Sequence, residues 1–319
     1  MSSGERPPDP QSWGNQTDAS GTVNEKTKPQ ETSPQPSPWK REGARKATFT
    51  NGLRYVVLSL IAILFLLPFY LILRNALMTD DQITSMHWSW FPSHPHWENF
   101  SGLFTDKSTG MATGLDNSAI IASVTLVLQM LFSSMAGYAL ARIPARGKGA
   151  VFGVILGTLM IPGAVTFVPA FAVVAYLGGV NTQWGIIAPG VFSAFSIFLF
   201  RQFYLRFPTE VEEAGRIDGL GYFGIYWRLL LPNSTSIFMA LGVLTFIGSW
   251  NSFLWPLVIG QDPSSWTVQI VLSTFLTAQT VKLSQLFAAA AVAVVPLVLV
   301  FLLMQRYIVE GAKFSGGKE

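Results

Sequence analysis

Long apolar runs separated by short polar stretches dominate the chain. Six such runs occur, at residues 55–73, 118–141, 150–177, 184–200, 236–259 and 284–305. Each is close to the length of about 20 residues that a helix needs to cross a hydrocarbon core of about 30 Å. Their interiors contain no Asp, Glu, Lys or Arg. The pattern therefore predicts an all-α membrane protein with six transmembrane helices.

Prolines interrupt the third, fourth, fifth and sixth predicted spans. Pro162 and Pro169 fall in the third run, Pro189 in the fourth, Pro256 in the fifth and Pro296 in the sixth. Each proline removes one backbone donor and permits a bend, which is tolerated where neighbouring helices or water satisfy the freed carbonyl. Together they favour a core that contains a cavity over a rigid helical bundle.

One long charged segment, residues 208–232, lies between the fourth and fifth runs. Its charges would cost roughly 2.5 to 3.5 kcal/mol each at a bilayer centre, so the segment is predicted to lie in water at the membrane surface. The sequence of this segment predicts two short helices. Thr209 and Glu212 have the spacing of a capping box, and Gly219 can end the first helix in the left-handed conformation.

The second short helix is predicted from four apolar residues that share one face of a 3.6-residue period. Pro232 follows them and disfavours helix at the residue before it. The four residues are Phe223, Tyr226, Trp227 and Leu230.

The same segment resembles the EAA loop of permease subunits in binding-protein-dependent ABC importers. The matching residues are Glu213, Ala214, Gly215, Gly219, Leu229, Leu231 and Pro232. Gly215 stands where the family has a second Ala, and Leu229 stands where Ile is usual. The resemblance implies a coupling helix that docks in a cleft of a cytoplasmic ATPase subunit. Glu213 and Asp218 would then offer acceptors, and Ala214, Gly215 and Gly219 would permit close approach.

Residues 248–257, GSWNSFLWPL in the fifth run, place polar groups between two tryptophans. They resemble the Trp-Asn-x-Phe-x-x-Pro-Leu stretch of the carbohydrate branch of these permeases, although Ser252 stands where an acidic residue is frequent. Asn251 and Ser252 suit sugar hydroxyl groups, and Trp250 and Trp255 suit the apolar faces of sugars. Two other roles are equally compatible with the sequence. Asn251 could make an interhelical hydrogen bond, and the indoles could anchor the span at the membrane interface. Gln129 in the second run is a weaker candidate for the same path.

Charge and composition orient the predicted spans. Half the residues are hydrophobic and 12% are charged, against about 25% charged in soluble domains. With a cytoplasmic N-terminus, 18 of the 21 Lys and Arg residues lie inside, and only Arg74, Lys107 and Lys282 lie outside. The positive-inside rule therefore predicts that both termini, and the segment 208–232, lie in the cytoplasm. The resemblance to ABC importer permeases implies the cell membrane of a prokaryote. A net charge of +3 gives no indication of nucleic-acid binding.

Three regions are expected along the chain. Residues 1–50 are rich in Pro, Ser, Gln and charged residues and are predicted to form a disordered cytoplasmic tail. Residues 51–310 form the six-helix domain, and residues 311–319 a short cytoplasmic C-terminal tail. The absence of cysteine excludes disulfides and thiolate metal sites. His87, His94 and His96 crowd one outer loop without an acidic cluster, which favours a solvated loop over a metal site.

The resemblance implies a permease subunit of a carbohydrate ABC importer, similar to the maltose-type second permease, for a di- or oligosaccharide. The chain has no Gly-rich phosphate loop, so it is not expected to bind ATP by that means. The spans contain no paired carboxylates, no His and no Ser with a plausible base, so no enzyme activity and no cofactor are expected. The implied partners are a second homologous permease, two ATPase subunits, an extracytoplasmic sugar-binding protein, the sugar and the lipid bilayer. An ion-coupled secondary transporter, a membrane-embedded enzyme and a non-transporting channel or scaffold are the alternatives, and the uncharged interiors of the spans disfavour the first.

Overall fold

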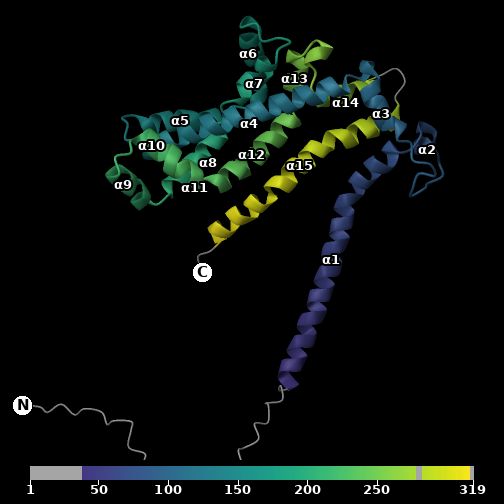
Figure 1. The fold of residues 1–319 in the computed structure, drawn as a ribbon, viewed down its shortest axis with the longest axis horizontal. Helices are drawn as coiled ribbons and strands as arrows, with labels where there is room; N and C mark the ends of the chain where they lie inside the picture. The colour runs from purple at the N-terminus through teal and green to yellow at the C-terminus, as the bar shows by residue number, and fades with distance from the viewer. Residues whose placement is uncertain (1–37, 278–281, 317–319) are drawn as a thin grey trace, which may run out of the picture. The chain divides into compact units, whose positions relative to one another are not determined.

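The structure is a computed structural model that describes the backbone of residues 38–277 and 282–316. It is helical, and the described residues contain no strand. Contacts divide the chain into two units, residues 1–63 and 64–319, of which the first holds the start of α1 and the second every later element (Figure 1). The helices are α1 (Pro38–Ala76), α2 (Asp80–Thr84), α3 (Glu98–Thr105), η1 (Lys107–Thr109), α4 (Met111–Arg142), α5 (Lys148–Thr158), α6 (Gly163–Tyr176), α7 (Gln183–Ile187), η2 (Ala188–Gly190), α8 (Ala194–Leu205), α9 (Thr209–Ile217), α10 (Tyr222–Ile225), the π-helical turn η3 (Tyr226–Leu230), α11 (Leu231–Asn233), α12 (Thr235–Trp250), α13 (Leu254–Ile259), η4 (Pro263–Ser265), α14 (Val268–Thr277) and α15 (Leu283–Gly316).

The helices give three membrane spans, and up to six if each bent pair of helices is counted as one span. Three are continuous: Arg54–Ala76 of α1, the whole of α4, and Leu283–Gln305 of α15. The other three are bent pairs, with angles of 100° between α5 and α6, 44° between α7–η2 and α8, and 77° between α10–α11 and α12. The prediction of an all-α protein with six membrane-crossing helices is confirmed.

The prolines bend the chain at some of the predicted places and not at others. Pro162 precedes α6 at the 100° bend, and Pro189 lies in η2 at the 44° bend. Pro169 and Pro296 lie inside α6 and α15, which continue through them. The fifth predicted run is not one helix to residue 259, because α12 ends at Trp250 and Pro256 occupies the first turn of the separate α13. A proline is tolerated in a first turn, where its missing N–H would have had no partner.

The ends of the predicted domain also differ from the structure. α1 begins at Pro38, inside the segment 1–50 predicted to be a disordered tail. Its first residues include Lys, Arg, Glu and Ala, which have high helix propensity even where apolar content is low. The prediction for residues 1–37 lies outside the described residues. At the other end α15 continues to Gly316, beyond the predicted boundary at residue 310.

The polar stretch between α1 and α4 carries the three histidines. His96 Nδ1 lies 2.5 Å from Glu98 Oε1 at an exposed position. Within the part of the chain that the structure describes, no three His, Cys, Asp or Glu side chains come together as a metal site. A hydrogen bond joins this stretch to α15: the backbone N–H of Ser284 donates to Asp80 Oδ1 at 2.8 Å.

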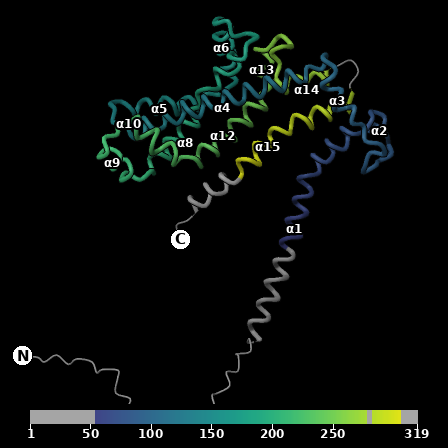
Figure 2. Tube along the Cα trace, in the orientation of Figure 1, coloured from purple at the N-terminus to yellow at the C-terminus, as the bar shows by residue number. Residues whose placement is uncertain are grey.

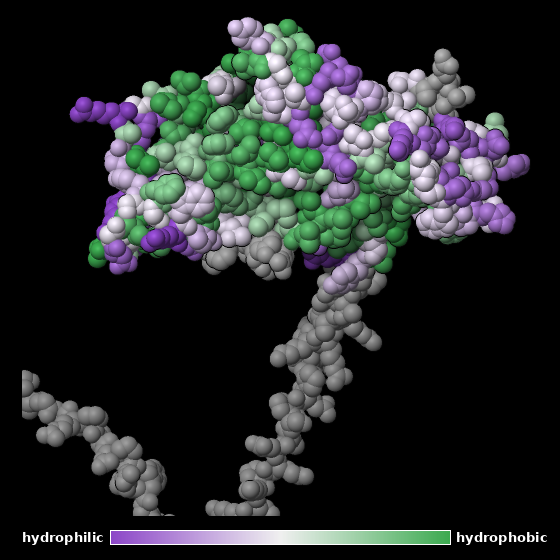
Figure 3. All heavy atoms as spheres, turned by 45° about the horizontal axis from the view of Figure 1, so that its top comes forward, coloured by the Kyte–Doolittle hydropathy of each residue, from purple (hydrophilic) through white to green (hydrophobic). Residues whose placement is uncertain are grey.

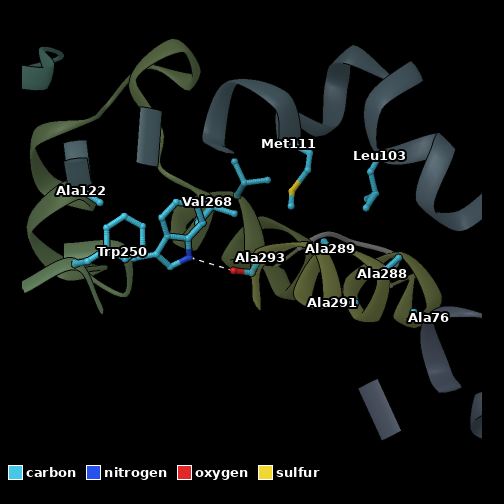
Figure 4. Packing of buried hydrophobic residues seen from close by; sticks show 12 residues of the cluster. Ala76, Leu103, Met111, Ala122, Trp250, Val268, Ala288, Ala289, Ala291 and Ala293 are labelled. Atoms are coloured by element: carbon cyan, nitrogen blue, oxygen red, sulfur yellow. Dashed lines mark hydrogen bonds between the residues drawn. The ribbon is translucent and has the colours of Figure 1, made fainter. Parts of the chain in front are cut away.

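Buried side chains in residues 64–319 gather in three clusters along the length of this unit. One joins α4, α12, α14 and α15, where four alanines of α15 allow the helices to approach closely (Figure 4). A second joins α4, α8 and the segment 220–241, and a third joins α4 with α6, α7 and α13. The surface of this unit shows a broad hydrophobic area flanked by hydrophilic residues (Figure 3), as expected of a protein surrounded by lipid.

Candidate functional site

The segment 208–232 begins at α9, but not through the predicted capping box. Pro208 is the flanking residue, and no side chain caps the helix. Thr209 lies inside the first turn, where its hydroxyl is past the capping position. Glu212 is only 3% exposed, and its carboxylate is engaged by Arg142 of α4, with Arg142 Nε 3.0 Å from Glu212 Oε1. The capping-box prediction is therefore wrong, because Glu212 pairs with a cation far away in the sequence.

α9 ends where the sequence predicts, at Gly219. Gly219 has a φ of 81°, in the left-handed region. The N–H of Leu220 donates to Gly215 O at 2.9 Å, and the N–H of Gly219 donates to Arg216 O at 3.0 Å. These two bonds form a Schellman motif, which satisfies the last carbonyls of the helix. The prediction that Gly219 ends the first helix is confirmed.

The second half of the segment differs from the regular helix that the sequence predicts. α10 passes into the π-helical turn η3 and then into α11, which contains Pro232. Because Pro232 has no N–H, it cannot complete a regular α-helical ladder, and the preceding turn widens while the helix continues. The chain bends instead at Ser234, between α11 and α12. The predicted stop at Pro232 is therefore wrong.

The widened turn also changes which apolar residues are buried. Tyr226 and Leu230 are buried, as predicted, but Phe223 is 66% exposed and Trp227 is 39% exposed. Their rings pack on each other, with centroids 5.9 Å apart. The single apolar face expected from a 3.6-residue period is thus divided between the protein interior and the surface.

Four of the five residues implicated in coupling to an ATPase lie at the surface of this segment. Glu213, Ala214, Asp218 and Gly219 are exposed, whereas Gly215 is buried against η3. A Cβ atom on Gly215 would lie 2.6 Å from Leu229 Cδ1, so this glycine allows α9 to pack closely on η3. The neighbouring Ile217 is 86% exposed. The segment therefore presents two carboxylates beside apolar side chains.

A second candidate site is an open pocket of about 400 Å³ between α4, α7, η2 and α12. It brings together Gln129, Ser252 and Trp255, three of the five residues assigned to a substrate path from the sequence. Its lining is Ile121, Gln129, Ile186, Pro189, Gly190, Thr245, Gly248, Ser249, Ser252 and Trp255. None of these lining residues is charged.

Hydrogen bonds fix the side chains of Gln129, Thr245 and Trp255 in this pocket. Gln129 Nε2 donates to Ser196 Oγ and to Thr245 Oγ1, each at 3.0 Å. Trp255 Nε1 donates to Gly185 O at 3.2 Å, and its ring meets Phe167 edge to face at 5.6 Å. The indole is therefore held by α6 and α7 with its position set before any ligand binds.

The other two residues assigned to the path lie outside the pocket lining. Trp250 is 2% exposed, and its Nε1 donates to Ala293 O at 3.1 Å (Figure 4). Asn251 follows the last residue of α12, is exposed, and accepts a hydrogen bond from Gln269 Nε2 at 3.2 Å. Both side chains thus connect α12 to α15 or α14.

Sequence reasoning missed Thr245 as a pocket residue, although a signal for it was present. Thr245, Gly248, Ser249 and Ser252 lie at i, i+3, i+4 and i+7, which is one face of a helix. A polar and small-residue stripe in an otherwise apolar span indicates a face turned to protein or water. That periodicity identifies the pocket face more accurately than the tryptophans do.

Comparison with known proteins gives this chain a family. Residues 129–313 match the family described as binding-protein-dependent transport system inner membrane component. An arabinooligosaccharides transport system permease protein of Halalkalibacterium halodurans is 37% identical over 227 residues, which are 71% of this chain and 81% of that protein. A lactose transport system permease protein of Rhizobium radiobacter is 33% identical, over 81% of this chain and 93% of that protein. An sn-glycerol-3-phosphate transport system permease protein of Yersinia pestis is 33% identical, over 81% of this chain and 94% of that protein.

A solved structure shares the fold. The crystal structure of a bacterial ABC transporter involved in the import of the acidic polysaccharide alginate has a chain that superposes with a TM-score of 0.73 at 20% identity. The match covers 82% of this chain and 98% of that one. The alternatives of an ion-coupled secondary transporter, an embedded enzyme and a scaffold have no such support. The chain belongs to the family of binding-protein-dependent transport system inner membrane components and is a permease subunit rather than an enzyme.

Proposed function

We propose that this permease subunit forms half of the path for a neutral di- or oligosaccharide. The observation that carries the proposal is the pocket chemistry: hydroxyl and amide groups of Gln129, Thr245, Ser249 and Ser252 beside the indole of Trp255. Sugars need such donors and acceptors for their hydroxyl groups and an apolar surface for their ring faces. The relatives named for arabinooligosaccharides and lactose support a carbohydrate.

The absence of charge from the pocket lining distinguishes between substrates of the relatives. One relative is named for sn-glycerol-3-phosphate, and the solved transporter imports alginate, an acidic polysaccharide. A phosphate or carboxylate in a path of low dielectric would need a cation to offset its desolvation. Since the described lining residues of this chain offer no cation, an uncharged substrate fits them better.

The remaining parts of the importer are proposed as partners. A second homologous permease would complete the path, two ATPase subunits would drive it, and an extracytoplasmic sugar-binding protein would deliver the substrate. The exposed Glu213, Ala214, Asp218 and Gly219 would dock on the ATPase, with both termini and this segment in the cytoplasm. Exposed Ile217 and Phe223 beside the carboxylates fit a protein partner better than open water.

The test is uptake by the complete transporter, assembled in vesicles with its partner subunits. We expect ATP-dependent uptake of a neutral oligosaccharide and little uptake of sn-glycerol-3-phosphate. Trp255→Ala and Ser252→Ala should each raise the KM for the sugar. Trp184→Ala and Ser123→Ala serve as matched controls, because both residues are exposed and lie outside the pocket lining. Preference for the charged substrate would contradict the proposed substrate class, and unchanged KM values would remove the pocket from the path.

A further inference from the structure

The helix α4 makes polar contacts near both ends and at its middle. It is continuous over 32 residues, a length of about 48 Å at 1.5 Å per residue. In the tube view it runs beside α14 near one end and toward α9 and α10 at the other (Figure 2). A continuous helix of this length can carry a displacement from one membrane face to the other.

At its C-terminal end, α4 holds the segment 208–232 through one stripe of side chains. Ser134, Tyr138 and Arg142 lie at i, i+4 and i+8, on the same face of the helix. Ser134 Oγ and the Tyr226 hydroxyl share a buried hydrogen bond of 2.7 Å, and the Tyr138 hydroxyl donates to Tyr222 O at 3.1 Å. The stripe therefore contacts both α10 and η3.

Arg142, at the C-terminal end of α4, contacts α8, the residues that follow α8, and α9. Its Nε donates to Tyr204 O of α8 at 2.9 Å, and an Nη donates to Phe207 O. Glu212 Oε1 of α9 lies 3.0 Å from the same Nε. Because the single Nε hydrogen is directed to Tyr204, the contact with Glu212 is an ion pair. The side chains of Arg142 and Glu212 are 12% and 4% exposed. Buried pairs of this kind add little net stability but are costly to break, so they fix one arrangement of the groups they join.

At its N-terminal end, α4 holds the segment that follows α13. Asn117 Nδ2 donates to Ser264 O at 2.8 Å and to Trp266 O at 3.0 Å. Ser118 Oγ accepts from the N–H of Val268 at 2.8 Å, which fixes the start of α14. Between the two ends, Gln129 of the same helix lines the pocket. One continuous helix thus contacts the segment 208–232, the pocket and residues 264–268.

We propose that α4 transmits the movement of the segment 208–232 to residues 264–268, with Arg142 and Asn117 as the positioning residues at its two ends. The inference rests on the proposed function, since it assumes an ATPase that moves the segment. The helices joined covalently to the segment are less suited to the role. α8 has 12 residues and follows a bend, and α12 has 16 residues and ends at the break before Asn251.

The test removes the ion pair without leaving a buried charge. Arg142→Met and Glu212→Gln are combined in one variant of the complete transporter in vesicles. Arg146→Met with Glu210→Gln is the matched control, because both residues are exposed and lie in the neighbouring loop and the same turn of α9. The readout is the amount of sugar transported per ATP hydrolysed, which does not depend on how much complex assembles. We expect this ratio to fall at least about fivefold in the double variant and to stay at the wild-type value in the control.

A second readout follows the opposite end of α4. The chain has no cysteine, so Ser264→Cys provides a single site for a membrane-impermeant maleimide. We expect the labelling rate to change on addition of a non-hydrolysable ATP analogue in the otherwise wild-type transporter and in the control. In the double variant this nucleotide dependence should be lost.

Two results would overturn the inference: an unchanged transport ratio, or nucleotide-dependent labelling at position 264 that persists in the double variant. If the double variant does not assemble, Tyr138→Phe takes its place, because it removes one hydroxyl and keeps the ring packing on Tyr204 and Tyr226. An unchanged transport ratio, or nucleotide-dependent labelling at position 264 that persists, would then overturn the inference in the same way. A wild-type complex without ATP-driven uptake would instead count against the proposed function.

Discussion

Gly219 sets the direction in which the chain leaves α9. Its φ is 81°, and a Cβ atom there would meet open space, so only the backbone conformation restricts substitution. An L-residue in this conformation costs about 1–2 kcal/mol. We therefore expect Gly219→Val to redirect the loop before α10 and to weaken both co-purification with the ATPase subunit and sugar uptake. Gly221→Val is the control, since Gly221 has a φ of −77° and equally open surroundings. Equal losses in both variants would disprove the role of this turn.

Gly215 restricts substitution for a different reason, the close approach of α9 and η3. Its missing Cβ would lie 2.6 Å from the end of the Leu229 side chain, which can rotate away. We expect Gly215→Ala to retain ATPase association and uptake, and Gly215→Phe to lose both because no rotation of Leu229 makes room for a ring. Co-purification and uptake measure the two variants side by side. Loss of association in the Ala variant would mean that Gly215 itself contacts the partner.

At this scale the sequence predicts a residue's conformation better than its partners. Gly219 is predictable because a helix end with this spacing needs a residue that tolerates positive φ. Glu212 is not, because its capping-box spacing gives no indication of Arg142, which reaches it from another helix. Thr209 and Glu212 satisfy a local rule, and a distant cation overrides it.

Among the helices, α12 depends on Trp250 for its packing against α15. The indole is 2% exposed, stacks on Phe246 with centroids 5.7 Å apart, and donates to Ala293 O. Truncating a buried Trp typically costs about 3–5 kcal/mol. We expect Trp250→Ala to lower the thermal unfolding midpoint of the detergent-solubilised complex, and Trp250→Phe to lower it less. Trp255→Ala should affect the KM for sugar more than the midpoint. A Trp250 variant with normal stability and altered sugar preference would instead place this residue in the path.

Elements could be predicted from the sequence in number and type, but their interruptions only in part. The lengths of the apolar runs are sufficient to predict up to six spans, and the charged stretch at 208–232 is sufficient to predict a surface segment in two parts. They do not show whether Pro232 stops a helix or widens the turn before it. The buried hydrogen bond between Ser134 and Tyr226 favours the continued, widened helix, and it joins residues that are far apart in the chain. Nor do the apolar runs show the break after Trp250, where Asn251 accepts a hydrogen bond from Gln269 of α14.

At the scale of the whole molecule, we propose that the pocket is one side of a path. It is open, and its polar residues lie on α4, on α12 and at Ser252 after the end of α12, with Trp255 supplied by α13. A single chain cannot enclose an oligosaccharide there, which is consistent with a transport system of several membrane components. The sequence could predict the chemistry of this face from Gln129, Ser252 and Trp255. It could not predict that Trp250 and Asn251 lie outside it, because that depends on where α12 ends.

The orientation of the molecule in the membrane is the last prediction, and the uneven charge distribution carries it. Eighteen of the 21 Lys and Arg residues lie on the side assigned to the cytoplasm, and such an excess retains segments on that side during insertion. Arg146 and Ser264 are both exposed; Arg146 follows the C-terminal end of α4, and Ser264 lies beside its N-terminal part at Asn117. In intact cells we expect an impermeant maleimide to label Ser264→Cys, and to label Arg146→Cys only after permeabilisation. The reverse pattern would place the segment 208–232 outside, where no ATP-hydrolysing partner could reach it, and would remove the basis for coupling through Glu213 and Gly219.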